Sequence, residues 1–129
     1  MIAHIFEDLC DGCNACVAVC PTHVLDAGRP VPVIARLDQC QTCYMCELYC
    51  ASDAIYVAPD QHEAEAIDVD VIRTSGVLGQ IRRDHGWDRP AEQGAHLDHY
   101  RHLGPLLREG GETAAARYRE RHAGTATTE

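Results

Sequence analysis

The sequence has no lysine, and all eleven of its basic side chains are arginines. Twenty acidic side chains outnumber them, which gives a formal net charge of −9 and argues against nucleic acid as a partner. No apolar run approaches the length of a membrane span, and residues 1–8 show neither the basic nor the apolar segment of a secretory signal. We therefore expect a cytoplasmic protein whose partners are other proteins rather than nucleic acid or membrane.

The charge is divided unevenly along the chain. Residues 1–72 carry twelve acidic side chains and two arginines, which leaves −10. Residues 73–129 carry eight acidic side chains and nine arginines, which leaves +1. The acidic N-terminal region is expected to be steered toward a basic docking surface on a protein partner.

The eight cysteines fall in two runs with the same spacing, C-x2-C-x2-C-x3-C. The first run is Cys10, Cys13, Cys16 and Cys20, and the second, thirty positions later, is Cys40, Cys43, Cys46 and Cys50. Soft thiolate ligands suit iron–sulfur clusters, and cysteines this close together let one loop supply three ligands of a cube. A zinc site built from C-x2-C pairs would leave the third and fourth cysteines of each run as surplus. A disulfide framework would need a secreted context, which residues 1–8 do not support.

On these two runs, residues 1–58 resemble the bacterial ferredoxins that hold two [4Fe–4S] clusters. The resemblance implies an α+β fold, a (βαβ)2 domain with an internal pseudo-twofold, in which each run lends its last cysteine to the other run's cluster. The implied ligands are Cys10, Cys13, Cys16 and Cys50 for one cluster and Cys40, Cys43, Cys46 and Cys20 for the other. The chain departs from the family at one point: proline follows Cys20, as is usual after both runs, but alanine follows Cys50.

The pattern between the cysteines predicts short elements. Strands are expected at residues 3–6, 24–26, 31–35 and 54–57, and short helices at 16–20 and 46–50. Residues 59–129 are expected to form a largely irregular extension that contains short helices. Within it, the alternation of apolar and acidic residues at 66–71 predicts a half-exposed strand, and residues 113–122 an amphipathic helix. We expect Gly104-Pro105 to interrupt any long helix and residues 123–129 to be disordered.

The layout of head and extension resembles the ferredoxin-like small subunit of adenylylsulfate reductase and related subunits paired with flavin enzymes of the fumarate-reductase type. That resemblance implies a larger flavoprotein subunit that docks on residues 59–129. Trp87, Tyr100, Tyr118 and the nine arginines fit the composition of interface cores. Alternatively, Trp87 packs back on the head and the arginines pair with its acidic surface.

Three histidines, His96, His99 and His102, follow one another at x2 spacing, and histidine is a common metal ligand. On a helix, positions three apart share a face but positions six apart do not, so the three do not converge. We expect them to be solvated or part of an interface rather than ligands.

Together these features predict an electron-transfer protein, specifically the ferredoxin-like subunit of an oxidoreductase complex, with no catalytic site of its own. No phosphate-binding loop, nucleophile elbow or catalytic carboxylate pair is present in the sequence. Two alternatives stay open: a free, diffusible ferredoxin with several partners, and a binding or redox-sensing module that uses the clusters as structural staples.

Overall fold

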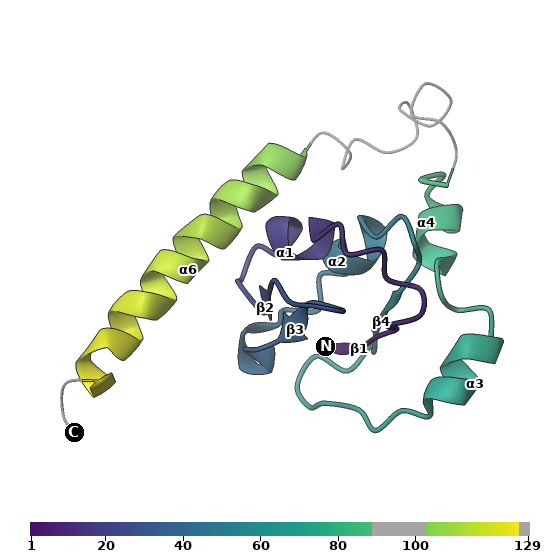
Figure 1. The fold of residues 1–129 in the computed structure, drawn as a ribbon, viewed down its shortest axis with the longest axis horizontal. Coiled ribbons are helices and arrows are strands. Elements are labelled where there is room, and N and C mark those ends of the chain that lie inside the picture. The colour runs from purple at the N-terminus through teal and green to yellow at the C-terminus, as the bar shows by residue number, and fades with distance from the viewer. Residues whose placement is uncertain (89–102, 127–129) are drawn as a thin grey trace.

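The computed structural model describes residues 1–88 and 103–126. Short strands and helices alternate through the first 57 residues, and further helices follow (Figure 1). In chain order the elements are β1 (Ile2–Ile5), α1 (Ala15–Val19), β2 (Leu25–Asp26), β3 (Val33–Ile34), the 3-10 helix η1 (Leu37–Gln39), α2 (Met45–Leu48), β4 (Ile55–Val57), α3 (Val69–Thr74), α4 (Gln80–Asp84) and α6 (Gly104–Ala126). The expected mixture of helix and strand is confirmed at this level. Among the described residues no helix combines the length and the apolar character needed to cross a bilayer.

Two small antiparallel sheets form the frame of the head, by which we mean residues 1–58. Strand β1 pairs with β4, with Ile5 opposite Ile55, and β2 pairs with β3, with Leu25 opposite Ile34. The apolar side chains of these strands form the core together with the buried cysteines: Ile2, Ile5, Cys16, Cys20, Val24, Leu25, Ile55 and Val57. The head is therefore small, and its core is built around the cysteine runs.

Helices α1 and α2 begin in the same unusual way. The residue before each helix, Asn14 or Tyr44, has a left-handed backbone with φ of 58° and 64°. These residues are thirty positions apart, the same offset as the two cysteine runs. The left-handed residue turns the chain sharply out of each cysteine loop into a helix that carries the third cysteine of the run.

Residues 66–71 do not form the expected strand; the chain enters helix α3 at Val69. Asp68 explains the difference, because its Oδ1 accepts hydrogen bonds from the backbone N–H groups of Asp70 (3.0 Å) and Val71 (3.3 Å). This is an N-cap, which satisfies donors that a helix otherwise leaves unpaired. Arg73, in the last turn, forms two hydrogen bonds with Asp8 and stacks over the ring of Phe6, so α3 is fastened to the head.

Trp87 is buried against the head and is not an exposed anchor for a partner, which corrects the expectation that it serves docking. Only 8% of its surface is accessible, and its ring meets Tyr49 edge-on with centroids 4.9 Å apart. Arg82 of α4 donates to the carbonyl oxygens of Leu48 (2.6 Å) and Trp87 (3.0 Å). The alternative, that Trp87 packs back on the head, is the one the structure supports.

Helix α6 corrects the expectation of a largely irregular extension. It continues without a break through Gly110, Gly111 and residues 123–126, where disorder was expected. Pro105 lies in the first turn, where its missing N–H has no partner to lose, so it begins the helix instead of breaking it. His96, His99, His102 and Tyr100 lie outside the described residues, as do residues 127–129.

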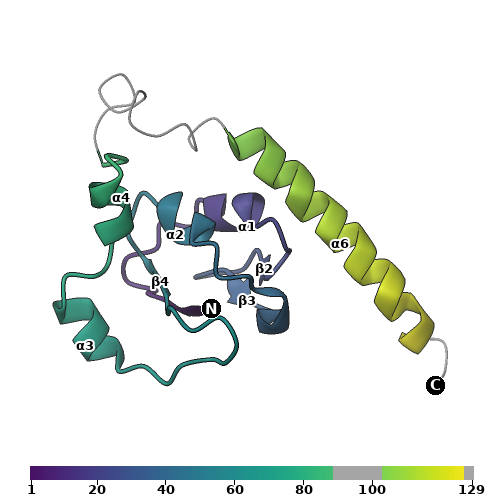
Figure 2. The same ribbon diagram turned by 180° about the vertical axis from the view of Figure 1, so that it is seen from behind.

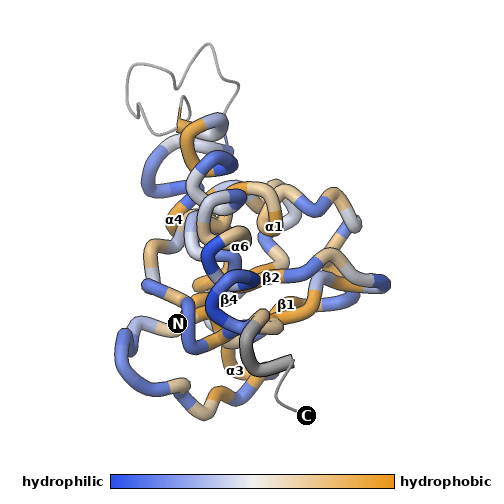
Figure 3. Tube along the Cα trace, turned by 90° about the vertical axis from the view of Figure 1, so that its left-hand side faces the viewer, coloured by the Kyte–Doolittle hydropathy of each residue, from blue (hydrophilic) through white to orange (hydrophobic). Residues whose placement is uncertain are grey.

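Helix α6 runs along the side of the head that carries α1, opposite α3 and α4, as both ribbon views show (Figures 1 and 2). Gly111 permits this close approach. A Cβ atom on Gly111 would lie 2.6 Å from the carbonyl oxygen of Cys20, whereas one on Gly110 would be in ordinary contact with Pro21 at 3.6 Å. The helix is mostly hydrophilic, unlike strands β1 and β4 (Figure 3). It is thus held by a narrow strip of contacts that includes the buried Ala115.

Candidate metal centre

The eight cysteines surround two separate cavities. Four of them line the first cavity together with Ile5, Pro32, Ala54 and Ile55: Cys10, Cys13, Cys16 and Cys50. The other four line the second cavity together with Ile2, Val24, Leu25, Tyr44 and Val57: Cys20, Cys40, Cys43 and Cys46. Each cavity therefore combines three cysteines of one run with the last cysteine of the other, the grouping that the resemblance to two-cluster ferredoxins implies.

Backbone geometry in the first loop directs its cysteines toward the first cavity. Gly12 has a φ of 78°, in the left-handed region that glycine adopts at little cost. The side chain of Asp11 closes the turn, because its Oδ1 accepts a hydrogen bond from the N–H of Cys13 at 3.1 Å. This bond is the main reason that the pKa of Asp11 lies below its usual value.

Backbone N–H groups point at three of the cysteine sulfurs. Val24 donates to Sγ of Cys20 and Ala54 to Sγ of Cys50, each at 3.4 Å and each from four positions further along the chain. The N–H of Ile2 donates to Sγ of Cys40, also at 3.4 Å. Such bonds stabilise a sulfur that carries negative charge, and in iron–sulfur proteins they are among the factors that set the reduction potential.

Burial makes some of the thiols, Cys16 and Cys46 among them, poor acids in the absence of a metal. It raises the pKa of Cys16 to about 11, with a further contribution from the neighbouring Cys50, Cys13 and Cys10. Burial also raises the pKa of Cys46 well above its usual value. Without a metal these sulfurs are protonated at neutral pH, whereas a bound metal deprotonates its thiol ligands outright. A set of four soft donors in an apolar pocket fits an iron–sulfur cluster.

One buried acid was not singled out from the sequence. Glu47, in α2, is only 5% exposed, and its Oε2 accepts a hydrogen bond from the N–H of Val57 at 3.1 Å. Burial raises its pKa to about 7, with the charge of Asp53 as a smaller contribution. This side chain ties α2 to the end of β4. Its position between Cys46 and the buried Leu48 was the only sequence feature that pointed to burial.

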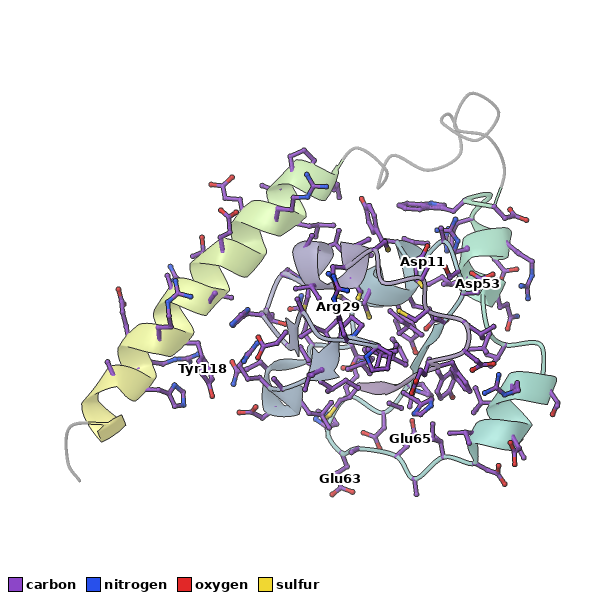
Figure 4. All side chains as sticks on the ribbon, in the orientation of Figure 1. Asp11, Arg29, Asp53, Glu63, Glu65 and Tyr118 are labelled. Atoms are coloured by element: carbon purple, nitrogen blue, oxygen red, sulfur yellow. The ribbon has the colours of Figure 1, made fainter. Side chains whose placement is uncertain are left out.

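Helix α6 and the β2–β3 region meet beside the second cavity. The guanidinium of Arg36 binds both carboxylate oxygens of Asp26, donates to the carbonyl oxygen of His23, and lies 5.5 Å from the ring centre of Tyr118. His23 faces Tyr118 edge-on, with ring centres 6.4 Å apart. Burial, reinforced by the charge of Arg36, lowers the pKa of His23. Tyr118 is therefore engaged with the head, on the side away from Asp11 (Figure 4).

Comparison with known proteins now identifies the class to which this arrangement belongs. A 4Fe-4S binding domain is matched by residues 3–26. The chain is 37% identical, over 62 residues, to an uncharacterized ferredoxin of Methanocaldococcus jannaschii; the match covers 46% of this chain and all of that protein. The chain belongs to the 4Fe–4S ferredoxins. It is an iron–sulfur protein of electron transfer, as the cysteine spacing predicts.

A second relative is a much larger protein. Over 85 residues the chain is 35% identical to one of the subunits of the H(2):CoB-CoM heterodisulfide,ferredoxin reductase of Methanothermobacter thermautotrophicus. The match covers 53% of this chain but only 12% of that larger polypeptide. No solved structure matches the chain.

Proposed function

We propose that the head holds two [4Fe–4S] clusters, one in each cysteine-lined cavity. Cys10, Cys13, Cys16 and Cys50 would bind the first, and Cys20, Cys40, Cys43 and Cys46 the second. The observation that carries the proposal is the division of eight cysteines between two cavities with four in each. The left-handed residues Asn14 and Tyr44, and the matching N–H···S bonds at Cys20 and Cys50, support a pseudo-twofold domain over residues 1–58.

The proposed function of the chain is that of an electron-transfer subunit, which passes electrons to or from a flavin-containing catalytic subunit. The clusters would supply reversible one-electron storage. The chain itself contributes the thiolate ligands, the apolar walls that exclude water, and the N–H groups that favour charge on sulfur. The relation to a heterodisulfide reductase subunit supports a larger oxidoreductase as the partner.

We assign the docking of that partner to residues 59–129, with α6 as the main surface. Trp87 is not part of this surface, because it is buried. Leu106 of α6 is 62% exposed, and the arginines that follow it on the helix, Arg108, Arg117, Arg119 and Arg121, are exposed as well. Arginine and large apolar side chains are the residue types that interfaces favour. A reducing compartment such as the cytoplasm would keep the eight thiols available for iron.

A free ferredoxin that serves several partners is the second candidate. It is supported by the ferredoxin relative, which is matched along its whole length by 62 residues, so a ferredoxin needs little more than the head. The packing of Gly111 against Cys20 supports it too, because α6 then acts as a cover that belongs to the protein itself.

Metal analysis of the full chain, purified without oxygen, tests the cofactors. We expect about eight iron and eight sulfide per chain, since each cube has four of each, and electron paramagnetic resonance signals of reduced [4Fe–4S] centres. Two zinc ions per chain and no sulfide would overturn the proposal. A second experiment captures the full chain from its native cell and records the flavin spectrum of the captured material. A dedicated subunit should bring a flavoprotein with it in fixed ratio, whereas a free carrier would not.

A further inference from the structure

The first cavity reaches the surface through Cys13. This cysteine is exposed, whereas the other seven are buried or half-buried. Its neighbours Gly12 and Asn14 are small, and Asp11 is turned to the backbone, so nothing large from the first loop covers the sulfur. A partner could therefore approach the first set of ligands more closely at Cys13 than at the other three cysteines.

A groove beside the first cysteine loop carries an arginine whose charge no described residue pairs. The groove has a volume of about 350 Å³ and lies between Cys10, Asp11, Gly12 and Asn14 on one side and the loop that joins β2 to β3, Gly28–Arg29–Pro30, on the other. Arg29 is exposed and forms no hydrogen bond or ion pair with any described residue, whereas Arg36, the other arginine of the head, is bound to Asp26. Figure 4 labels Arg29 and Asp11 on the head, away from α6.

The carboxylate of Asp11 does not neutralise this arginine. Its hydrogen bonds go to the N–H of Cys13 and to Ser52, and these bonds lower its pKa. Within the described part of the chain, Arg29 is therefore a cation of the acidic head that has no ion-pair partner. A planar guanidinium in this position is suited to a carboxylate, which it can bind with two parallel hydrogen bonds.

The second cavity is less accessible on its corresponding side. Tyr44 stands where the first loop has Asn14, and it lines the cavity. Cys20 is buried, and its carbonyl oxygen lies directly beneath Gly111 of α6. A protein that approached from this side would first have to displace the helix.

We propose that electrons enter or leave the protein at the Cys13 edge of the first cavity, where Arg29 pairs with a carboxylate group on the surface of a redox partner other than the subunit that docks on α6. This inference depends on the proposed electron-transfer function, and it adds the site and the partner's chemistry. Each transfer at this edge moves one electron with no bond made or broken: an electron that leaves oxidises the ferredoxin and reduces the partner by one equivalent, and an electron that enters does the reverse. Around the carboxylate, the partner's surface would be basic, because the exposed carboxylates of Glu7 and Asp11 lie just before and within the first loop.

The test uses the full iron-loaded protein and two trianionic probes of different chemistry. Hexacyanochromate(III) is paramagnetic but does not react, so it broadens the amide signals of residues near its binding place. Ferricyanide takes one electron from the reduced protein, and its rate is followed by stopped flow at low ionic strength. Three variants are compared: Arg29→Gln, Arg29→Lys and, as a matched charge change on α6, Arg117→Gln.

We expect hexacyanochromate to broaden residues 27–31 and Arg29→Gln to remove the broadening. The same variant should slow the oxidation of the reduced protein by ferricyanide roughly fivefold, because one cation near a trianion is lost. Added salt should remove this difference. Arg29→Lys should keep the oxidation rate of the unsubstituted protein, and Arg117→Gln should change that rate by less than about half of its value. The proposal is overturned if Arg29→Gln leaves both readouts unchanged, or if Arg117→Gln is the variant that slows oxidation. Iron content and electron uptake, measured on the same samples, report separately on the proposed function.

Discussion

The two cysteine loops have one spacing and two different surroundings. The first, residues 10–16, contains Gly12 and Asn14 and opens to solvent at Cys13. The second, residues 40–46, contains Tyr44, and its cavity includes Cys20, whose carbonyl oxygen lies against Gly111 of α6. Cysteine spacing thus determines which sulfurs can meet around a cluster, while the residues between and beyond the cysteines determine how closely a partner can approach them.

The largest effects are expected from cysteine pairs that separate the two cavities. Cys13→Ser combined with Cys50→Ser alters two residues of the first cavity and should leave about four irons of eight. Cys13→Ser combined with Cys20→Ser alters one residue of each cavity and should leave close to none. Iron and sulfide analysis of the purified variants measures both.

Single variants Cys13→Ser, Cys20→Ser and Cys50→Ser provide the reference for these pairs, because coupled residues do not add. If each run held its own cluster, the two double variants would exchange results: the pair Cys13 and Cys20 would keep half the iron. That outcome would contradict the shared arrangement of the two runs.

A smaller effect is expected at the contact between α6 and Cys20, one of the residues that line the second cavity. Gly111→Ala places a methyl group where the Cys20 carbonyl oxygen now lies, so we expect α6 to loosen by about 1–3 kcal/mol. Gly110→Ala is the control, since its methyl group has room and alanine favours helix by about 0.5–1 kcal/mol. Hydrogen exchange of the α6 amides should therefore become faster in the first variant and slower in the second. Equal protection in both would show that α6 does not depend on this contact.

Two arginines fasten the extension to opposite sides of the head, and they form a matched pair. Arg36 binds Asp26 and stacks on Tyr118, while Arg73 binds Asp8 and stacks on Phe6. Lysine preserves the charge but loses the paired hydrogen bonds and the planar stacking. Arg36→Lys should raise exchange in residues 115–122 by the equivalent of about 1 kcal/mol, and Arg73→Lys should affect α3 less because its pair is more exposed. A larger effect from Arg73→Lys would reverse this ranking.

The smallest expected effect is a pH dependence confined to the α6 side. Burial and Arg36 lower the pKa of His23 below 6.5, with Arg119 acting in the same direction and Asp26 in the opposite one. The unfolded chain then binds a proton that the folded chain does not, so the contribution of His23 to stability is present above pH 6.5 and is lost as pH falls below it. After correction for the pH dependence of the intrinsic exchange rate, the protection of residues 115–122 against exchange should fall between pH 7 and pH 5.5. In His23→Asn this loss of protection should disappear, and its persistence would assign the pH dependence to another group.

Much of the head could be predicted from the sequence because its constraints are local. Cysteine spacing, the short apolar stretches and Pro21 placed the elements of residues 1–57 within a few positions of those observed. The cofactor class, confirmed by the ferredoxin relatives, follows from the same spacing. The division of the cysteines between two cavities could not be predicted from local patterns, because it joins residues about twenty to forty positions apart.

The extension was harder to predict because single side chains and packing against the head override its local patterns. Residues 66–71 alternate as a strand would, but one side chain, Asp68, starts a helix instead. Gly110 and Gly111 lower the helix propensity of α6, and they are tolerated because that surface lies against Cys20 and Pro21. Tryptophan is a residue type that interfaces favour, and only the contact of Trp87 with the ring of Tyr49 shows that this interface lies within the protein itself.

The glycine contact also limits how the length of α6 can change. Each residue added to or removed from a helix turns everything beyond it by about 100°. One deletion between Pro105 and Gly110 would leave the start of the helix in place but rotate a side chain with a Cβ atom onto the Cys20 carbonyl. Changes beyond His122 would not alter this contact. The stretch from Pro105 to Gly111 therefore acts as a spacer in which substitutions on the solvent side are acceptable but a one-residue deletion is not.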